Sequence, residues 1–113
     1  MPVYMVTLVR KKDKQKYNEY NAALTKLIEK HGGHILVRGG RVIPLFRGRE
    51  LERRRVDKVT IIEFPSAAAH GHFFTSREYL DLVTLRDEAA ELRGFLLEGY
   101  VPDKRLEDPV RVG

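Results

Sequence analysis

The sequence predicts a single α+β domain with the element order β-α-β-β-α-β. Three features predict it: dense runs of β-branched and apolar residues, two stretches with apolar residues at helical spacing, and capping or turn residues between them. The chain has 113 residues, a size at which one domain can build a core without disulfides or metals. We assign the domain to residues 1–100 and a loose tail or partner-binding arm to residues 101–113.

The first strand and the first helix have clear local signals. Residues 3–9 form a dense apolar run typical of a strand. Asp13 can cap the helix that follows, and Gly32-Gly33 can end it with a left-handed residue. The helix carries one apolar stripe, which consists of Tyr17, Tyr20, Leu24, Leu27, Ile28 and His31.

A second strand is expected over residues 34–46. Gly39-Gly40 interrupts it, and paired glycines in a strand indicate a bulge or a sharp twist. Pro44 cannot donate a ladder hydrogen bond, so this end of the strand is expected at a sheet edge. Residues 47–55 contain five arginines and no apolar periodicity, which predicts an exposed connection.

The second half of the chain repeats the pattern of strand, helix and strand. Residues 56–64 are the third strand, ended by Pro65, and Ser66 can cap a short helix. Ser76 can cap the main helix, whose buried side is expected to comprise Tyr79, Leu82, Val83, Arg86, Ala89 and Ala90. Residues 95–100 are the last strand. This order is the ferredoxin-like arrangement, a four-stranded antiparallel sheet with helices on one face.

The strands are apolar on both faces, which predicts a homodimer. In the first strand Val3, Met5 and Val9 alternate with Tyr4, Val6 and Leu8, so neither face is polar. Two main helices can cover only one face, and a soluble monomer seldom exposes so large an apolar patch. We expect a second copy to cover the other face by two-fold symmetry. The alternative is that the connection over residues 47–55 or the tail over residues 101–113 covers this face, which is disfavoured because both segments are polar.

Composition excludes several classes of function. The chain has no cysteine, so disulfides, thiolate metal sites and a thiol nucleophile are ruled out. It has a formal charge of +5, and the excess of basic residues lies in residues 10–16 and 47–55. Neither segment contains aromatic residues on which bases could stack, so nucleic-acid binding is disfavoured. No P-loop, nucleophile elbow or dinucleotide fingerprint is present, and no cofactor is expected. The absence of a signal sequence or a span of about 20 apolar residues predicts a cytoplasmic protein without membrane contact.

Several short stretches resemble the bacterial domain-of-unknown-function 1330 family of the dimeric α/β-barrel superfamily. They are Tyr17-x-x-Tyr20, Gly32-Gly33-x-x-Leu36-Val37-Arg38-Gly39-Gly40, Glu63-Phe64-Pro65-Ser66, Ser76-x-Glu78-Tyr79, Arg86 and Glu98-Gly99. The chain departs from the family where Phe73-Phe74 replaces a Trp-Tyr pair and Arg77 replaces a proline. The resemblance implies a ferredoxin-like fold and dimerisation, and it implies no reaction.

Four charged residues on predicted strands and helices are candidates for the site. Arg38 lies in a strand beside two glycines, where a fixed guanidinium can clamp a carboxylate; a structural ion pair with Glu63 or Glu98 is the alternative. Glu63 and Glu98 are also a candidate acid–base pair if they meet in the fold. Arg86 lies on an apolar stripe and needs a polar partner, either an acidic core residue or a ligand.

Histidines and tyrosines complete the candidates. His34 begins a strand and can reach a pocket mouth, so it joins Glu63 as a candidate for proton transfer. Tyr20 and Tyr79 combine an apolar ring with a hydroxyl and can line a pocket, although core packing is the commoner role. His70 and His72 are two residues apart in helical or irregular chain, and a metal pair is disfavoured there.

These residues lead to one main hypothesis of function and two alternatives. The main hypothesis is a pocket between sheet and helices for a small apolar or aromatic anion, held by Arg38, with catalysis of the monooxygenase or isomerase type implied only by the superfamily. One alternative is a non-catalytic ligand-binding or protein-interaction module. The other is a nucleic-acid-binding surface on the basic loops.

Overall fold

The computed structural model describes residues 1–99. Tyr100, expected at the end of the last strand, and the expected tail over residues 101–113 lie outside the described residues. In chain order, the elements are β1 (Val3–Lys11), α1 (Lys14–Lys30), β2 (His34–Arg38), α2 (Gly48–Arg54), β3 (Lys58–Phe64), α3 (Ala67–Phe74), α4 (Arg77–Asp81), α5 (Val83–Ala89) and β4 (Ala90–Glu98).

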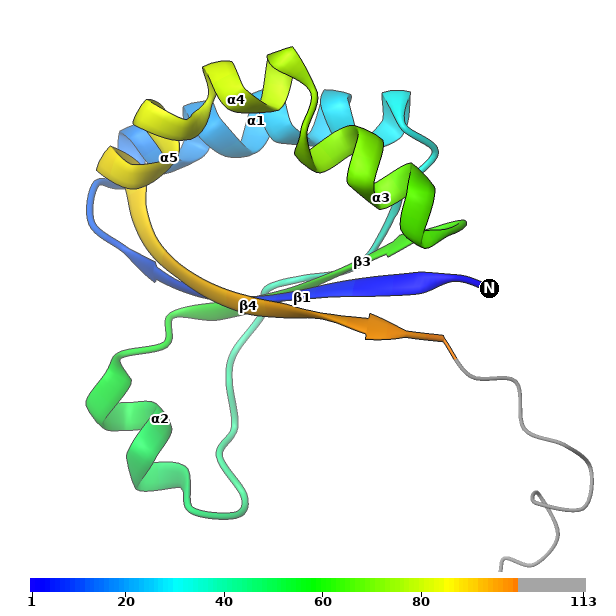
Figure 1. Ribbon diagram of the computed structural model, residues 1–113. Coiled ribbons are helices and arrows are strands. Elements are labelled where there is room, and N and C mark those ends of the chain that lie inside the picture. The colour runs from blue at the N-terminus through cyan, green and yellow to red at the C-terminus, as the bar shows by residue number, and fades with distance from the viewer. Residues whose placement is uncertain (100–113) are drawn as a thin grey trace, which may run out of the picture.

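The four strands form one antiparallel sheet in the order β2-β3-β1-β4. Helices α1, α3, α4 and α5 lie over one face, and α2 lies on the other side of the sheet (Figure 1). We call the first the helix-covered face and the second the outer face. The ferredoxin-like α+β fold predicted from the sequence is confirmed. Within one chain the sheet is open and does not close into a barrel.

The capping residues read from the sequence define where the helices begin. The Asp13 side chain accepts a hydrogen bond from the backbone N–H of Lys16 at 3.0 Å, at the start of α1. Ser66 caps α3 in the same way, and Ser76 caps α4. Gly32 has a positive φ of 78°, as expected for a glycine that ends a helix.

Several predicted elements differ from the structure. The second strand ends at Arg38, because Gly39 and Gly40 adopt positive φ values of 80° and 97° and turn the chain out of the sheet. The segment expected to be an irregular connection contains α2, in which Glu50 in the first turn and two arginines in the last turn complement the helix dipole. The main helix of the second half is two short helices, α4 and α5, that meet at Leu82.

The last strand also begins earlier than predicted, at Ala90 instead of Phe95.

Two hydrophobic clusters lie under the helices. One is centred on Phe64 and Phe73, both fully buried, and the other on Val9 and Ala89. Residues of both clusters line a cavity between the strands and the helices. No helix among residues 1–99 combines the length and the apolar character that a bilayer crossing requires.

Candidate functional site

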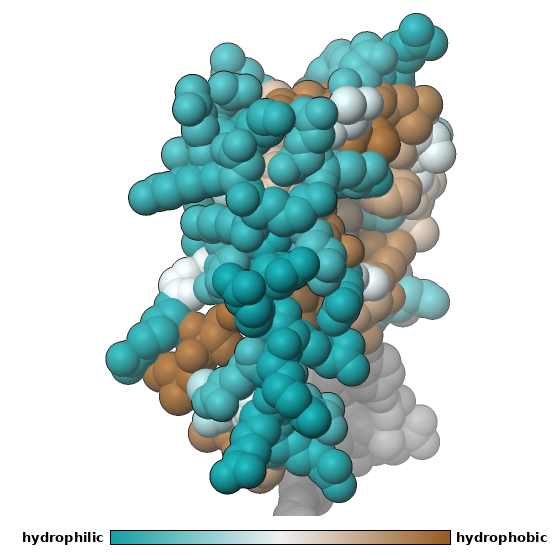
Figure 2. Space-filling view, turned by 90° about the vertical axis from the view of Figure 1, so that its left-hand side faces the viewer, coloured by the Kyte–Doolittle hydropathy of each residue, from teal (hydrophilic) through white to brown (hydrophobic). Residues whose placement is uncertain are grey.

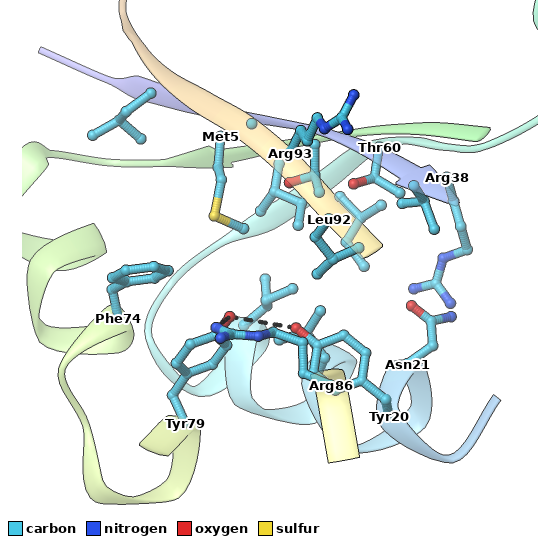
Figure 3. Close-up of a pocket in the computed structure, with 18 of the residues that line it drawn as sticks. Met5, Tyr20, Asn21, Arg38, Thr60, Phe74, Tyr79, Arg86, Leu92 and Arg93 are labelled. Carbon is cyan, nitrogen blue, oxygen red and sulfur yellow. Dashed lines mark hydrogen bonds between the residues drawn. The ribbon is translucent and has the colours of Figure 1, made fainter. Parts of the chain in front are cut away.

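A cavity of about 460 Å³ lies between the helix-covered face of the sheet and the helices. Alternate residues of β1 (Met5, Thr7 and Val9) form part of its floor, because side chains of one parity point to one face of a sheet. Neighbouring strands add residues in register with these, and the helices supply its roof, which is at the bottom of the view in Figure 3. The other residues used below that line it are Tyr17, Tyr20, Asn21, Arg38, Thr60, His70, Phe74, Tyr79, Arg86 and Arg93.

Three polar side chains of the roof form a hydrogen-bonded cluster. The Arg86 Nη1 donates to the Tyr79 hydroxyl at 3.1 Å, and the Tyr79 and Tyr20 hydroxyl oxygens are 3.4 Å apart. Figure 3 shows these side chains directed toward one another from three helices. Tyr20 and Tyr79 are only 3% and 6% exposed. Burial raises the pKa of Tyr20, and the adjacent Tyr79 hydroxyl adds to this effect, so Tyr20 remains a protonated donor.

Arg86 also contacts Asp87, its neighbour in the chain, through a 3.1 Å hydrogen bond from Nε to Oδ1. The sequence suggested an acidic core residue as the partner, whereas the Asp87 side chain is 66% exposed. Burial acts to lower the pKa of Arg86, but the contacts with Tyr79 and Asp87 outweigh it and raise the value. The guanidinium therefore stays charged beside the tyrosine hydroxyls.

Arg38, the last residue of β2, is the second arginine that lines the cavity. It pairs with Thr60 in the β2–β3 register, and its Nη2 donates to the Thr25 hydroxyl at 3.1 Å. Neither of the ion pairs considered from the sequence, with Glu63 or Glu98, is formed. Among residues 1–99 no carboxylate forms a salt bridge with Arg38. Its charge is therefore available at the cavity.

Two lysines reinforce the positive charge near Arg38. The Nζ atoms of Lys11 and Lys58 lie 5.2 and 4.9 Å from the centre of the Tyr17 ring. Burial lowers the pKa of Lys58, and the charges of Lys11 and Arg38 lower it further. Gly39 permits this arrangement, because a Cβ there would lie 3.2 Å from Lys58 Cε.

His70 of α3 also lines the cavity, although the sequence suggested it only as part of a disfavoured metal pair. Its Nε2 lies 3.4 Å from the Met5 sulfur, and its ring stacks on Phe74 with centroids 5.4 Å apart. Burial lowers the pKa of His70, which favours a neutral imidazole. Within residues 1–99, no group of three or more His, Asp or Glu side chains is placed to hold a metal ion.

The two residues expected to transfer protons in the cavity lie outside it. His34 and Glu63 are direct cross-strand partners, and Glu63 is also opposite Tyr4, which places all three on the outer face. A hydrogen bond with Glu63, with smaller contributions from desolvation and from the carboxylate's charge, raises the pKa of Tyr4. Glu98 is opposite Val3 on the other face, so Glu63 and Glu98 do not meet. Strand β1 lies between β3, which carries Glu63, and β4, which carries Glu98, and the two side chains point to opposite faces of the sheet.

Four residues singled out from the sequence do line one cavity: Arg38, Tyr20, Tyr79 and Arg86. Sequence reasoning missed Asn21, Thr60, Phe74 and Arg93 as lining residues. Asn21 lies one position beyond Tyr20 on α1. Thr60 has the same strand parity as the buried Ile62, and that alternation is a signal which could have found it.

The chain matches the family model described as "Domain of unknown function (DUF1330)" over residues 2–100. The protein belongs to this family. No curated protein gives a significant match. Among solved structures, the RPA0582 protein of unknown function from Rhodopseudomonas palustris is 24% identical, with a TM-score of 0.70 over 89% of this chain and 84% of that one.

Two more distant structures share the fold of this DUF1330 member. A protein of unknown function from Bacteroides fragilis, described as dimeric and ferredoxin-like, is 15% identical, with a TM-score of 0.57 over 87% of this chain and 96% of that one. SnoaB from Streptomyces nogalater, described as a cofactor-independent oxygenase, is 10% identical, with a TM-score of 0.59 over 89% of this chain and 95% of that one. At these identities the likeness concerns the fold alone.

Proposed function

We propose that each protomer of this protein binds a small, largely apolar or aromatic anion in the cavity between sheet and helices. The observation that carries the proposal is the position of Arg38: its guanidinium lines an apolar cavity and has no carboxylate partner among residues 1–99. Arg38 is exposed to solvent, so its guanidinium is accessible to a bound anion, and a carboxylate that accepts two hydrogen bonds suits it best.

The size and the charge of the cavity support the same ligand class. A volume of about 460 Å³ lies within the range of small-molecule sites, roughly 300–1,000 Å³. Lys11 and Lys58 stand near Arg38 around the Tyr17 ring, so an anion there would be attracted by three positive charges. The apolar floor and the aromatic residues of the roof would surround the remainder of the ligand.

The proposal is tested with a pair of fluorescent probes that differ by one charged group. 8-Anilino-1-naphthalenesulfonate carries an anion, and N-phenyl-1-naphthylamine is its uncharged counterpart. We expect Arg38→Gln to weaken binding of the sulfonate about tenfold or more, because a charge-assisted hydrogen bond contributes about 1.5–3 kcal/mol. Binding of the uncharged probe should change little.

Arg77→Gln is the matched control for this experiment. Arg77 lies on α4 with its side chain 88% exposed, and it pairs only with Asp81 among residues 1–99. Its substitution should leave the affinity of both probes unchanged. Equal affinity of the sulfonate for the Arg38 variant and the unsubstituted protein would show that Arg38 does not hold the anion.

Turnover of the ligand is a further part of the proposal, supported by analogy with SnoaB. Within the cavity the neutral imidazole of His70 can accept a proton, and the hydroxyls of Tyr20 and Tyr79 can donate hydrogen bonds. The sequence-based candidates Glu63 and His34 would act only on a molecule bound at the outer face. Incubation with aromatic acids, followed by mass spectrometry of the small molecules, would detect a product.

We also propose that the protein is a homodimer joined through the outer face. Phe95 and Leu97 on β4 are 56% and 54% exposed there, and Val37 on β2 is 39% exposed. The segment after β2 adds Leu45 and Phe46, which are 81% and 92% exposed. Figure 2 shows apolar side chains gathered at the height of α2 beside a largely hydrophilic surface. A second copy would remove this apolar area from water.

Native mass spectrometry tests the dimer directly. Phe95→Glu would place a charge in the proposed interface and should convert a species of twice the chain mass of 13.1 kDa into a monomer. Leu80→Glu is the control, since Leu80 is similarly exposed, at 55%, but lies on α4 above the other face. A monomeric unsubstituted protein would overturn the proposed dimer.

A basic hollow of about 570 Å³ beside α2 supports the alternative of a protein partner or, less well, a nucleic acid. It is lined by Arg10, Glu50, Arg53, Arg54, Arg55, Glu91 and Arg93. Glu91 pairs with both Arg10 and Arg93, so the charge available for a partner resides mainly in residues 53–55. Replacing these three arginines with glutamine should abolish binding of an anionic partner and leave binding in the cavity intact.

A further inference from the structure

We infer that Tyr20, Tyr79 and Arg86 form an oxyanion-binding site, and that the ligand is therefore a hydroxyaromatic or enolic acid whose phenol or enol oxygen binds there in the ionised form. The inference rests on the proposed function, because it assigns a second contact to the ligand that Arg38 is proposed to hold. It adds a second polar group to the ligand, an ionised oxygen at the end of the apolar body opposite the group that Arg38 holds.

The inference follows first from the number of protons in the cluster. The Tyr79 hydroxyl has one proton and already accepts a hydrogen bond from Arg86 Nη1 at 3.1 Å. Its own proton is therefore available for donation. Tyr20 likewise has one hydroxyl proton, and an arginine can only donate. The cluster thus has more donors than acceptors, and the group that satisfies it best is an acceptor, above all an oxygen anion.

The separation of the two hydroxyls leaves room for that acceptor. Their oxygens are 3.4 Å apart, whereas an O–H···O hydrogen bond is typically about 2.7–2.8 Å. The contact between the tyrosines is therefore weak, and either proton can turn to a better acceptor. A third oxygen about 2.7 Å from each hydroxyl would receive both protons and form a compact triangle with them.

The surrounding charges also favour an anion at this point. Arg86 lies behind Tyr79, with its guanidinium carbon 5.8 Å from the centre of the Tyr79 ring. Asp87 bonds Arg86 through Nε and offsets part of its charge, but the Asp87 side chain is exposed and is screened by water. The other titratable groups that line the cavity are Tyr17, Arg38, His70 and Arg93. Arg93 lies opposite Leu8, on the outer-face side of β4, and pairs with Glu91. Arg38 is therefore the additional cation at the cavity, and burial favours the neutral form of His70.

The positions of the polar groups define the ligand class. Figure 3 shows the Arg38 guanidinium beside Asn21, apart from Tyr79 and Phe74, with apolar side chains such as Leu92 between them. A ligand that reaches both places has a carboxylate at one end, an apolar body, and an ionisable oxygen at the other. Preorganised donors in a site with little water stabilise such a developing charge strongly.

6-Hydroxy-2-naphthoate is the probe for this inference, because its absorption spectrum reports whether its hydroxyl is ionised. We expect the bound probe to ionise at a pH at least one unit below that of the free probe, which corresponds to a tenfold preference for the anion. Tyr79→Phe and Arg86→Gln should each abolish most of this shift. Tyr4→Phe, which removes a tyrosine hydroxyl from the outer face, should leave it unchanged.

Two companion probes separate this inference from the proposed function. 2-Naphthoate lacks the hydroxyl and should bind the Tyr79 and Arg86 variants as well as it binds the unsubstituted protein. 2-Naphthol lacks the carboxylate and tests the oxyanion site without Arg38. If neither naphthoate binds but 2-naphthol binds as its anion, the proposed role of Arg38 is wrong and the oxyanion site is supported. If no bound hydroxyl ionises below its free value, or if the shift survives in both variants, the oxyanion site is overturned.

Discussion

Gly33 packs so closely against Ile28 that a Cβ on Gly33 would lie 2.7 Å from the Ile28 Cγ2 atom. The same Cβ would lie 3.0 Å from Cε1 of Phe64, which is fully buried. The end of α1 therefore approaches β3 with no room for a methyl group. We expect Gly33→Ala to lower the free energy of unfolding by about 1–3 kcal/mol, as overpacking of a core does. Urea unfolding followed by circular dichroism would measure the loss.

Gly71→Ala provides the opposite case. Gly71 lies inside α3, and a Cβ there would meet no atom within 4 Å. Alanine should therefore raise the free energy of unfolding by up to about 1 kcal/mol, through helix propensity alone. If Gly33→Ala were as stable as the unsubstituted protein, the close packing of α1 against β3 would be wrong.

The adjacent residues Phe73 and Phe74 have different tasks, which substitutions can separate. Phe73 is fully buried, with its ring centre 5.1 Å from that of Phe64 and 5.0 Å from that of Tyr79. Phe73→Ala should cost about 3–5 kcal/mol of stability. Phe74 is 45% exposed and lines the cavity, so Phe74→Ala should cost less stability but weaken binding of the uncharged naphthylamine probe.

Denaturant unfolding and probe titration on both variants check this prediction. Equal losses of stability would contradict the assignment of Phe73 to the core and Phe74 to the cavity wall.

The parts of the fold that were predicted correctly have short-range signals. Asp13 and Ser76 were recognised as helix starts because each side-chain oxygen accepts a hydrogen bond from a backbone N–H only three residues further along. Such a short-range contact can be predicted from the residue type and its position alone. Helix α2 was missed because it has seven residues and no apolar periodicity. The end of β2 was misjudged because Gly39 and Gly40 turn the chain away from the sheet, whereas paired glycines in a strand pattern also suit a bulge.

The candidate site shows a similar division. Tyr20, Tyr79 and Arg86 were found because helical spacing places them on the faces that pack toward the sheet. For Glu63 and His34 the sequence left the direction of the side chains open, because the strands are apolar on both faces and alternation then does not show which face the helices cover. The register resolves this, and it places both residues on the outer face.

Protonation of His70 should destabilise the fold in mildly acidic solution. Burial lowers the pKa of His70 in the folded protein, while in the unfolded chain the value is about 6.5. At pH values above 6.5 the imidazole is neutral in both states and has no effect on the pH dependence. As the pH falls below about 6.5, the unfolded state takes up the proton first, so stability is lost until the pH reaches the lower, folded value.

His70→Gln isolates this contribution from those of the other histidines. Urea unfolding at pH 7.5 and pH 5.5 should show a smaller loss of stability on acidification for the variant than for the unsubstituted protein. His72→Gln is the matched control, because His72 is exposed on the same helix. An identical loss in the His70 variant and the unsubstituted protein would show that His70 titrates as freely as a solvated side chain.

Ser76 connects the stability of α4 with the position of Tyr79. Its Oγ accepts a hydrogen bond from the Tyr79 N–H at 3.1 Å and donates one to the Phe73 carbonyl oxygen at 2.8 Å. Ser76→Ala removes both bonds and should cost about 1 kcal/mol. Because the Tyr79 backbone loses a fixed partner, the ionisation shift of bound 6-hydroxy-2-naphthoate should also decrease.

Ser66→Ala is the comparison that makes this prediction specific. Ser66 caps α3 by accepting a hydrogen bond from Ala69 N–H at 3.0 Å, so its loss should have a similar cost in stability. It has no direct bond to Tyr79, and the ionisation shift should persist in this variant. Ser76→Thr, which keeps the hydroxyl, should restore the shift. If both alanine variants reduced the shift equally, general loosening of the helices would explain the effect, and the cap of α4 would have no particular role in holding the Tyr79 hydroxyl.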